Sequence, residues 1–431
     1  MKPAGVFLAG AGSRLLPASI PFRFFGAAAV FHVAAWVALF AGADAVPRFA
    51  GGLGWTLAAL HLATLGVLAM TAIGAALQLL PVATRQPVGA THGPALVWWL
   101  YTPGVAATAC GMGIAQPIVL AAGAALVTLA LALFAVLLAR NLLGAKGMPA
   151  VVAHGWIAVA SLVVVLASAV ALAGAYVGLS VLARWHALAL HVAFAGYGFM
   201  GMLALGLSYI LVPMFALSPA PDERRALASA ACAAGALVLA GGAAFDVAAA
   251  ALRVAAVIVA AVAVTLHLRS MLQALATGLR RELGLSFRLV RIAWGCLVAS
   301  LVAALGVALD LPWEGAAPLL GLLLVGGWLL TFLLGVLQRI VPFLAAMHAG
   351  GAGRRPPTPS ALTAHRPLLL HFACHLAALA LLAVAIATDA PAAARFGAAA
   401  GTVGAAAFLA FFAAALRRRR PAPPGRAAPA A

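Results

Sequence analysis

Histidines inside apolar segments are the residues of this chain best suited to chemistry. The sequence contains 11 histidines, and at least five of them fall within long apolar segments. The eight Asp and Glu residues instead lie between those segments or at their ends. A polar side chain is costly in hydrocarbon, so an intramembrane histidine is a functional candidate. Imidazole without carboxylate favours a transition metal or haem iron over proton-coupled transport.

The composition indicates an all-α membrane protein with several spans. Of the 431 residues, 66% are hydrophobic and 8% are charged, and the mean hydropathy is +1.14. The net charge of +18 does not point to nucleic acid, because the basic residues cluster in loops and in the run Arg417–Arg420. That distribution is typical of loops that face cytoplasmic lipid headgroups. The lipid bilayer is therefore the expected partner.

Apolar runs bounded by Pro, Gly or charge predict about twelve transmembrane helices. Their predicted limits are 20–44, 52–81, 94–115, 117–143, 150–177, 183–216, 225–245, 247–278, 286–309, 315–347, 364–388 and 391–416. Residues 1–19 are expected to form a cytoplasmic N-terminal segment, and residues 417–431 a disordered basic cytoplasmic tail. Basic loops on one side place both termini in the cytoplasm. The opposite, outer side has few charges: Arg48, Arg184, Arg395, Asp44, Asp310, Glu314 and Asp389.

An internal repeat divides the single transmembrane domain (20–416) into three pseudo-symmetric units of four spans. The second, sixth and tenth segments each carry a glycine seven residues before a proline. The three pairs are Gly74 with Pro81, Gly206 with Pro213, and Gly335 with Pro342. These segments lie four spans apart, which predicts units at about 20–143, 150–278 and 286–416. Parallel repeats with an even number of spans share one orientation, as the topology requires.

The repeats also carry chemistry, because His61 and His191 each precede a glycine by five residues and a methionine, Met70 or Met200, by nine. With a helical rise of 1.5 Å per residue, His61 lies about 14 Å below the outer surface and His191 about 15 Å. His32 then lies at about 18 Å and His375 at about 21 Å. Several imidazoles are thus expected to meet in the outer half of the membrane.

These depths predict a haem or metal site. The preferred axial haem pair is His61 with His375, and His61 with His32 is the weaker pair. His371 shares a helix face with His375, and Met70 is a further candidate haem ligand. His191 and His186 are the candidate copper ligands, although the five residues between them put them about 140° apart on a helix.

Other polar residues have structural interpretations. Histidines near span ends are expected to bond neighbouring backbone carbonyls or hydroxyls: His92, His154, His267, His348 and His365. Arg253, near the outer face, is expected to snorkel, or else to pair with a haem propionate. The four cysteines lie in apolar segments without a CxxC motif and are expected to be small buried hydrophobic side chains.

The motifs His61-Leu-Ala-Thr-Leu-Gly…Gln-Leu-Leu-Pro81 and His191-Val-Ala-Phe-Ala-Gly…Leu-Val-Pro213 resemble the catalytic subunit of haem–copper oxidases, especially the cbb3 type. The chain is also similar to the NnrS family of haem- and copper-containing membrane proteins. The resemblance implies twelve helices in three arcs of four, with haems towards the outer side. It implies that His61 is an axial ligand of a b-type haem and that His191 occupies a copper-ligand position.

The chain departs from the oxidase pattern in two segments. The oxidases carry copper-binding histidines on segment seven and haem-binding histidines on segment ten. Here segment seven has none, and segment ten has none before His348. We therefore expect a haem-binding, and alternatively copper-binding, protein of the bacterial inner membrane that is not a complete terminal oxidase. Its role would be redox-related, linked to nitric oxide or the respiratory chain, with a cytochrome or respiratory complex as partner. A histidine-lined transporter or channel and an assembly partner of a respiratory complex remain alternatives.

Overall fold

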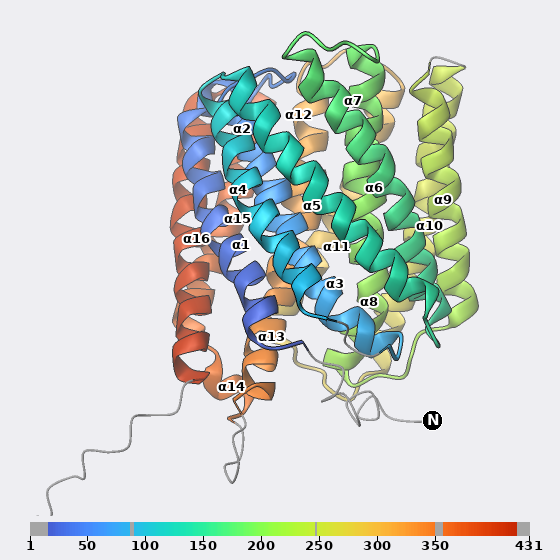
Figure 1. Cartoon of the computed structure of the whole chain (residues 1–431), viewed down its shortest axis with the longest axis vertical. Coiled ribbons are helices and arrows are strands. Elements are labelled where there is room, and N and C mark those ends of the chain that lie inside the picture. Colours follow the sequence, from blue (N-terminus) through green and yellow to red (C-terminus); the bar gives the residue numbers. More distant parts are fainter. Residues whose placement is uncertain (1–15, 87–89, 246–247, 350–356, 420–431) are drawn as a thin grey trace, which may run out of the picture.

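A computed structural model describes residues 16–86, 90–245, 248–349 and 357–419, and in this part of the chain helices joined by loops are present, without strands. The predicted N-terminal segment (1–19) and basic tail (417–431) lie mostly outside the described residues. Twelve long helical segments stand side by side as an upright bundle (Figure 1). Their limits agree with the predicted spans to within a few residues, so the fold class is confirmed.

Unit one comprises α1 (Ser19–Ala41), η3 (Ala43–Ala45), α2 (Trp55–His61), η4 (Leu62–Ala69), α3 (Met70–Ala83), α4 (His92–Gly113) and α5 (Pro117–Leu143). Unit two comprises α6 (Pro149–Ala175), α7 (Arg184–Ala193), η5 (Phe194–Met200), α8 (Gly201–Ala216), α9 (Glu223–Ala243) and α10 (Ala249–Thr277). Unit three comprises α11 (Gly284–Ala308), α12 (Ala316–Gly321), η6 (Leu322–Leu330), α13 (Thr331–Met347), α14 (Pro359–Leu362), α15 (His365–Thr388) and α16 (Pro391–Arg419).

Among the described helices, eleven are long and apolar enough to cross a membrane, and the twelfth long segment, α4, is not among them. It has 22 residues, a length of about 33 Å, but its Trp, Tyr, Pro and Gly residues lower its mean hydropathy. Helix α4 forms a tight hairpin with α5, because a Cβ atom at Gly111 would lie 2.3 Å from the Leu120 nitrogen. We therefore count α4 as the third span of unit one.

The second span of each unit is interrupted by a π-helical stretch. These stretches are η4, η5 and η6, and each begins 19 or 20 residues before Pro81, Pro213 or Pro342. A π-helical turn takes up extra residues and is frequent at functional sites. The same interruption at the same place in all three units confirms the internal repeat.

Glycines of the second span explain how each unit packs. The glycine seven residues before the proline touches the first helix of its own unit in all three cases. Distances from an added Cβ atom to its nearest neighbour are 2.8 Å for Gly74 with Phe24, 2.8 Å for Gly206 with His154 and 2.7 Å for Gly335 with Ser286. A second glycine, eight residues earlier, repeats the contact: Gly66 with Phe31, Gly198 with Ser161 and Gly327 with Cys296. The repeat is therefore a repeat of close helix packing.

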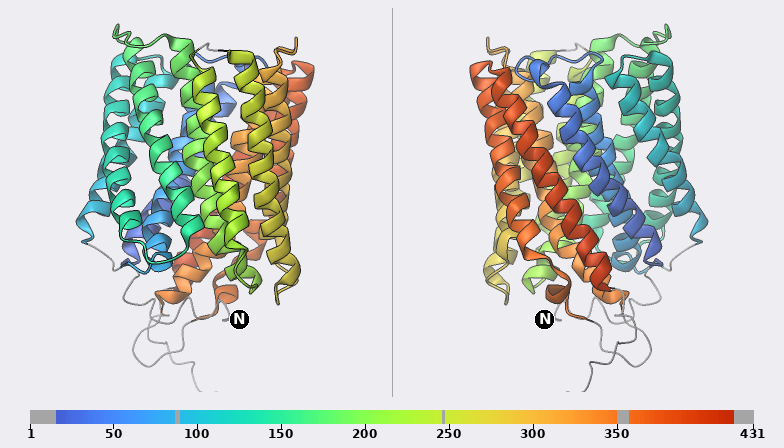
Figure 2. Two further views of the ribbon diagram at one scale, coloured as in Figure 1. Left: turned by 90° about the vertical axis from the view of Figure 1, so that its right-hand side faces the viewer. Right: turned by 90° about the vertical axis from the view of Figure 1, so that its left-hand side faces the viewer.

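The three units close into a ring. The fourth span of each unit packs on the first span of the next: α5 on α6, α10 on α11, and α16 on α1. The last contact is visible in the right panel of Figure 2, where α16 runs beside α1. The π-helical second spans meet inside this ring, where Tyr197 of η5 faces Trp328 of η6 at 6.0 Å between ring centroids.

Replacing Gly335 with leucine is expected to destabilise the bundle. The new side chain would meet the Ser286 carbonyl oxygen on α11, and backbone cannot move aside cheaply. Overpacking of this kind costs about 1–3 kcal/mol. The melting temperature in detergent should fall by several degrees. Gly295→Leu on exposed α11 surface, where an added Cβ meets nothing within 4 Å, is the control. Equal melting temperatures for both variants would contradict this packing.

Candidate functional site

Most histidines inside the bundle gather in three groups. We call His61 and His191 the central pair, and His32, His371 and His375 the seam cluster. The third group, the inner pair, is His154 and His267. By position along their helices, the central pair lies in the half of the bundle predicted to be outer, whereas the seam cluster lies nearer the middle, with His371 closest to the inner end of α15.

The central pair joins units one and two. His61 is the last residue of α2, directly before η4, and His191 lies on α7, three residues before η5. The ring centroids are 6.4 Å apart, and the ring planes differ by 21°. The sequence predicted these histidines for different sites, one for haem and one for copper. The structure instead places them side by side, from equivalent helices of two repeat units.

Hydrogen bonds define which ring nitrogens of the central pair are free. His61 Nδ1 lies 3.0 Å from the Leu57 carbonyl oxygen, which can only accept, so Nδ1 carries the proton. His191 Nδ1 lies 3.3 Å from Ser168 Oγ, and this hydroxyl donates its own proton to the carbonyl oxygen of Val164 or Val165. His191 Nδ1 is therefore also a donor. Both rings thus keep a lone pair on Nε2, the arrangement of metal-binding histidines with a hydrogen-bonded second nitrogen.

The spacing of the central pair fits two imidazoles on one metal. Two metal–nitrogen bonds of about 2.0–2.1 Å, with about 1.1 Å from each nitrogen to its ring centre, put the centroids about 6.3 Å apart. The observed 6.4 Å agrees with this value. Both side chains are half-buried. The spacing is therefore compatible with two imidazoles that would hold a single iron or copper ion.

The seam cluster lies where unit three meets unit one. His32 comes from α1, and His371 and His375 come from successive turns of α15. The His32 and His371 ring centroids are 6.1 Å apart, and those of His371 and His375 are 5.5 Å apart. All three side chains are at most 1% exposed. The histidines that were expected to meet in one layer therefore lie in two separate groups.

The predicted first pair, His61 with His375, has different neighbours in the structure. His61 faces His191, whereas His375 stacks on His371 and hydrogen-bonds Thr331 Oγ1 at 2.8 Å. The other predicted ligands are also placed. Met70 is fully buried at the start of α3. His186 hydrogen-bonds the Ala244 carbonyl oxygen and packs between Trp185 and Phe245, so its contacts differ from those of His191.

The inner pair was missed by sequence reasoning. His154 of α6 and His267 of α10 were expected to bond nearby backbone, and His154 Nδ1 does so with the Ala150 carbonyl oxygen at 2.8 Å. Neither ring nitrogen of His267, however, has a hydrogen-bond partner, and the residue is 0% exposed. Tyr209 stands between them, with ring centroids 5.5 Å from His154 and 5.1 Å from His267. Only the packing of three helices reveals this group.

Within the described residues, no group of three or more His, Cys, Asp or Glu side chains is placed to hold a metal ion. The central pair brings two imidazoles together.

Ion pairs join the outer loops above the seam cluster. Arg48 contacts Asp389 and lies 3.5 Å from Glu314, and Arg395 contacts Asp44 at 2.8 Å. Arg253, which was expected to snorkel, forms an ion pair with Asp310 at 3.2 Å. These pairs show that the charges predicted for the outer side do lie at one end of the bundle. Each pair is exposed and contributes little to stability.

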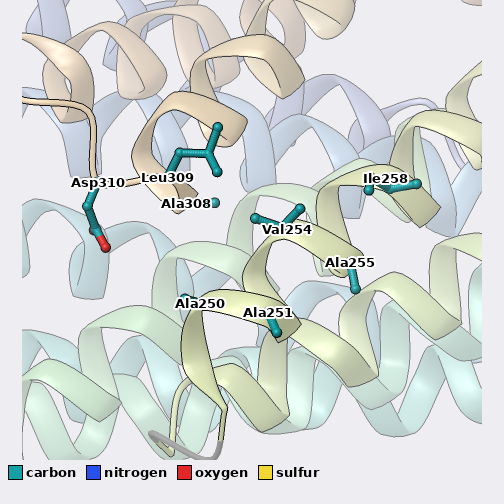
Figure 3. Close-up of a pocket in the computed structure, with 8 residues that line it drawn as sticks. All are labelled: Ala250, Ala251, Val254, Ala255, Ile258, Ala308, Leu309 and Asp310. Atoms are coloured by element: carbon teal, nitrogen blue, oxygen red, sulfur yellow. The ribbon is translucent and has the colours of Figure 1, made fainter.

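One groove on the surface lies apart from the histidines. It is a groove of about 560 Å³ between the start of α10 and the end of α11, and it contains no histidine (Figure 3). Its lining residues are Ala250, Ala251, Val254, Ala255, Ile258, Ala308, Leu309 and Asp310. The groove is almost wholly apolar and faces outward from the bundle, where lipid chains would fill it.

Comparison with solved structures identifies the fold. The chain is similar to a heme–copper terminal oxidase whose dimer was solved by cryo-EM, with a TM-score of 0.66 and 11% sequence identity. The alignment covers 95% of this chain and 86% of the oxidase chain. No protein-family model and no curated protein sequence matches the chain. The predicted oxidase-like fold is therefore confirmed at the level of the fold.

Proposed function

We propose that this protein binds one redox-active metal centre, a b-type haem, between His61 and His191. The geometry of the central pair supports the proposal. The two ring planes are nearly parallel and the ring centroids are 6.4 Å apart. In each ring Nδ1 is hydrogen-bonded to an oxygen, and the lone pair of Nε2 is available. The pairing differs from the one that sequence reasoning preferred. It keeps His61 and replaces His375 with His191, which was a candidate copper ligand.

Charge favours haem over a bare ion at this position. A cation taken out of water needs a compensating charge, and carboxylates usually provide it. All eight carboxylates of the chain lie between the predicted spans or at their ends. The porphyrin carries its own negative charge and neutralises ferrous iron, so a haem needs no carboxylate. Copper in its singly charged state is the alternative occupant, because two imidazoles suit it and its charge is low.

Each residue of the site has a defined task. His61 and His191 would hold the iron through their Nε2 atoms, and a haem bound in this way supplies reversible one-electron transfer. The Leu57 carbonyl oxygen keeps the proton of His61 on Nδ1, and Ser168 does the same for His191. These contacts fix the ring orientation and raise the basicity of the ligating nitrogen.

The role that follows is electron transfer or sensing, not complete oxygen reduction. The oxidase pattern needs further histidines on segments seven and ten, and this sequence has none in those places. We therefore place the protein in a redox, nitric oxide or respiratory role in the bacterial inner membrane, with a cytochrome or respiratory complex as electron partner. Its similarity to the NnrS family stays a prediction.

Absorption spectra of the detergent-purified protein, oxidised and dithionite-reduced, test the proposal together with metal analysis of the same sample. Sharp α and β bands after reduction and about one iron per chain are expected for a six-coordinate b-type haem. Copper without haem bands would assign copper to the pair. A featureless spectrum with neither iron nor copper would overturn the proposed function.

A further inference from the structure

The seam cluster has hydrogen-bonding requirements of its own, independent of the central pair. Three of its buried ring nitrogens have no partner: His32 Nδ1, His371 Nε2 and His375 Nδ1. A buried polar atom without a partner costs about 1–3 kcal/mol, and most such atoms in proteins are satisfied by protein or by bound water. The tautomer of each ring decides what kind of molecule would satisfy it.

Trp36 fixes the tautomer of His32. The Trp36 indole Nε1 lies 3.1 Å from His32 Nε2, and an indole N–H can only donate. His32 Nε2 must therefore accept, and the proton of the neutral ring sits on Nδ1. The unpartnered atom of His32 is thus an N–H donor.

Thr331 fixes the tautomer of His375. The Thr331 hydroxyl donates to the Gly326 carbonyl oxygen at 2.8 Å, so its oxygen accepts from His375 Nε2, also at 2.8 Å. The proton of His375 is on Nε2, and the unpartnered Nδ1 is an acceptor. His371 gives the same result in another way. Its Nδ1 donates to the Gly404 carbonyl oxygen at 3.1 Å, which leaves Nε2 as an acceptor.

The cluster therefore presents one donor and two acceptors. We propose that it binds one small neutral molecule that accepts one hydrogen bond and donates two, and that this molecule is water. A water oxygen would accept from His32 Nδ1–H, and its two hydrogens would go to His371 Nε2 and His375 Nδ1. All three unpartnered nitrogens would then be satisfied together.

The ring spacing is compatible with a shared water. Hydrogen bonds of about 2.9 Å, with about 1.1 Å from nitrogen to ring centre, place two rings on one water roughly 5.5–7 Å apart. The observed separations are 5.5 and 6.1 Å. Water with three hydrogen bonds is also the usual occupant of a buried polar site.

A metal cation fits the cluster less well. Only two of the three unpartnered nitrogens offer lone pairs, and the His32 N–H would point its positive end towards the ion. The carboxylates in the loops that follow α1 and α15, Asp44 and Asp389, are exposed and already paired with arginines. A neutral guest needs no counter-charge, whereas a buried cation does.

Solid-state NMR tests the proposal. The sample is the full chain with ¹⁵N-labelled histidine, in lipid nanodiscs and with any bound metal centre in its reduced state. We expect His32 and His371 as Nδ1–H tautomers, His375 as the Nε2–H tautomer, and magnetisation transfer from bound water to all three rings. Histidine-to-phenylalanine variants assign the signals. Trp36→Phe should give His32 a second tautomer, because it frees Nε2.

Two outcomes would overturn the proposal. One is the absence of water transfer to the three rings. The other is a metal bound by the cluster. It would shift the nitrogen signals of the three rings, and the double variant His61→Ala, His191→Ala would still contain about one metal ion per chain. The same double variant removes the proposed haem. A water signal that persists there would leave this inference standing even if the proposed function failed.

Discussion

Purified His61→Ala and His191→Ala proteins should each lack the six-coordinate haem spectrum. Each substitution removes one of the two imidazoles whose ring centroids lie 6.4 Å apart. Loss of a residue that merely orients a metal ligand already costs about 10–100-fold in metal affinity or activity, and loss of a ligand should cost at least as much. The measurement is the reduced α-band absorbance per protein chain, which should fall at least about tenfold.

His365→Ala is the matched control for these variants. His365 is exposed at the start of α15, so its loss should leave the absorbance unchanged. An unchanged six-coordinate spectrum in either His61→Ala or His191→Ala would contradict the assignment. A copper-only protein would show the same dependence in its copper content, so the variants test the pair irrespective of the metal.

Deleting Ala63 should also remove the cofactor, although Ala63 itself is no ligand. The residue lies in η4, between His61 and the packed Gly66. Removing one residue lets this π-helical stretch revert to regular α-helix. Helix α2, which precedes the stretch, then rotates by about 100° about the helix axis relative to α3, which follows it. His61 would then turn away from His191. We expect the haem absorbance per chain to fall to the level of His61→Ala.

The matched deletion is Val325 in η6, the equivalent stretch of unit three, which carries no histidine. It should disturb helix packing to a similar extent, measured as melting temperature, but the haem absorbance should persist. Ala63→Ser, which keeps the chain length, should retain haem as well. Retention of full haem after the Ala63 deletion would refute the positioning role of η4.

Hydropathy and the glycine–proline spacing predicted most of the fold. The span 117–143 coincides with α5, and Gly74, Gly206 and Gly335 pack alike in their units. These features are local or repeat along the chain, so one sequence contains them. The π-helical stretches were not predictable. Each breaks the 3.6-residue periodicity, so the faces on either side no longer follow from counting residues.

Depth was predicted better than partnership. His61 and His191 were placed at nearly equal depth, about 14 and 15 Å, and they do lie together. Rise along a helix gives the layer of a residue, but not the direction in which its side chain points. The predicted pairing of His61 with His375 therefore rested on depth alone, because the sequence does not show which helices face each other. His267 was undervalued for a related reason, since its burial depends on α6, α8 and α10 packing together.

A cryo-EM map of the purified protein, prepared without chelators, tests the central claim most directly. The account predicts density for one metal centre between the Nε2 atoms of His61 and His191, at about 2.0–2.1 Å from each, with a planar macrocycle around it if the centre is haem. Contact of the two rings with only water or protein side chains, in a sample whose iron and copper contents are both negligible, would contradict it.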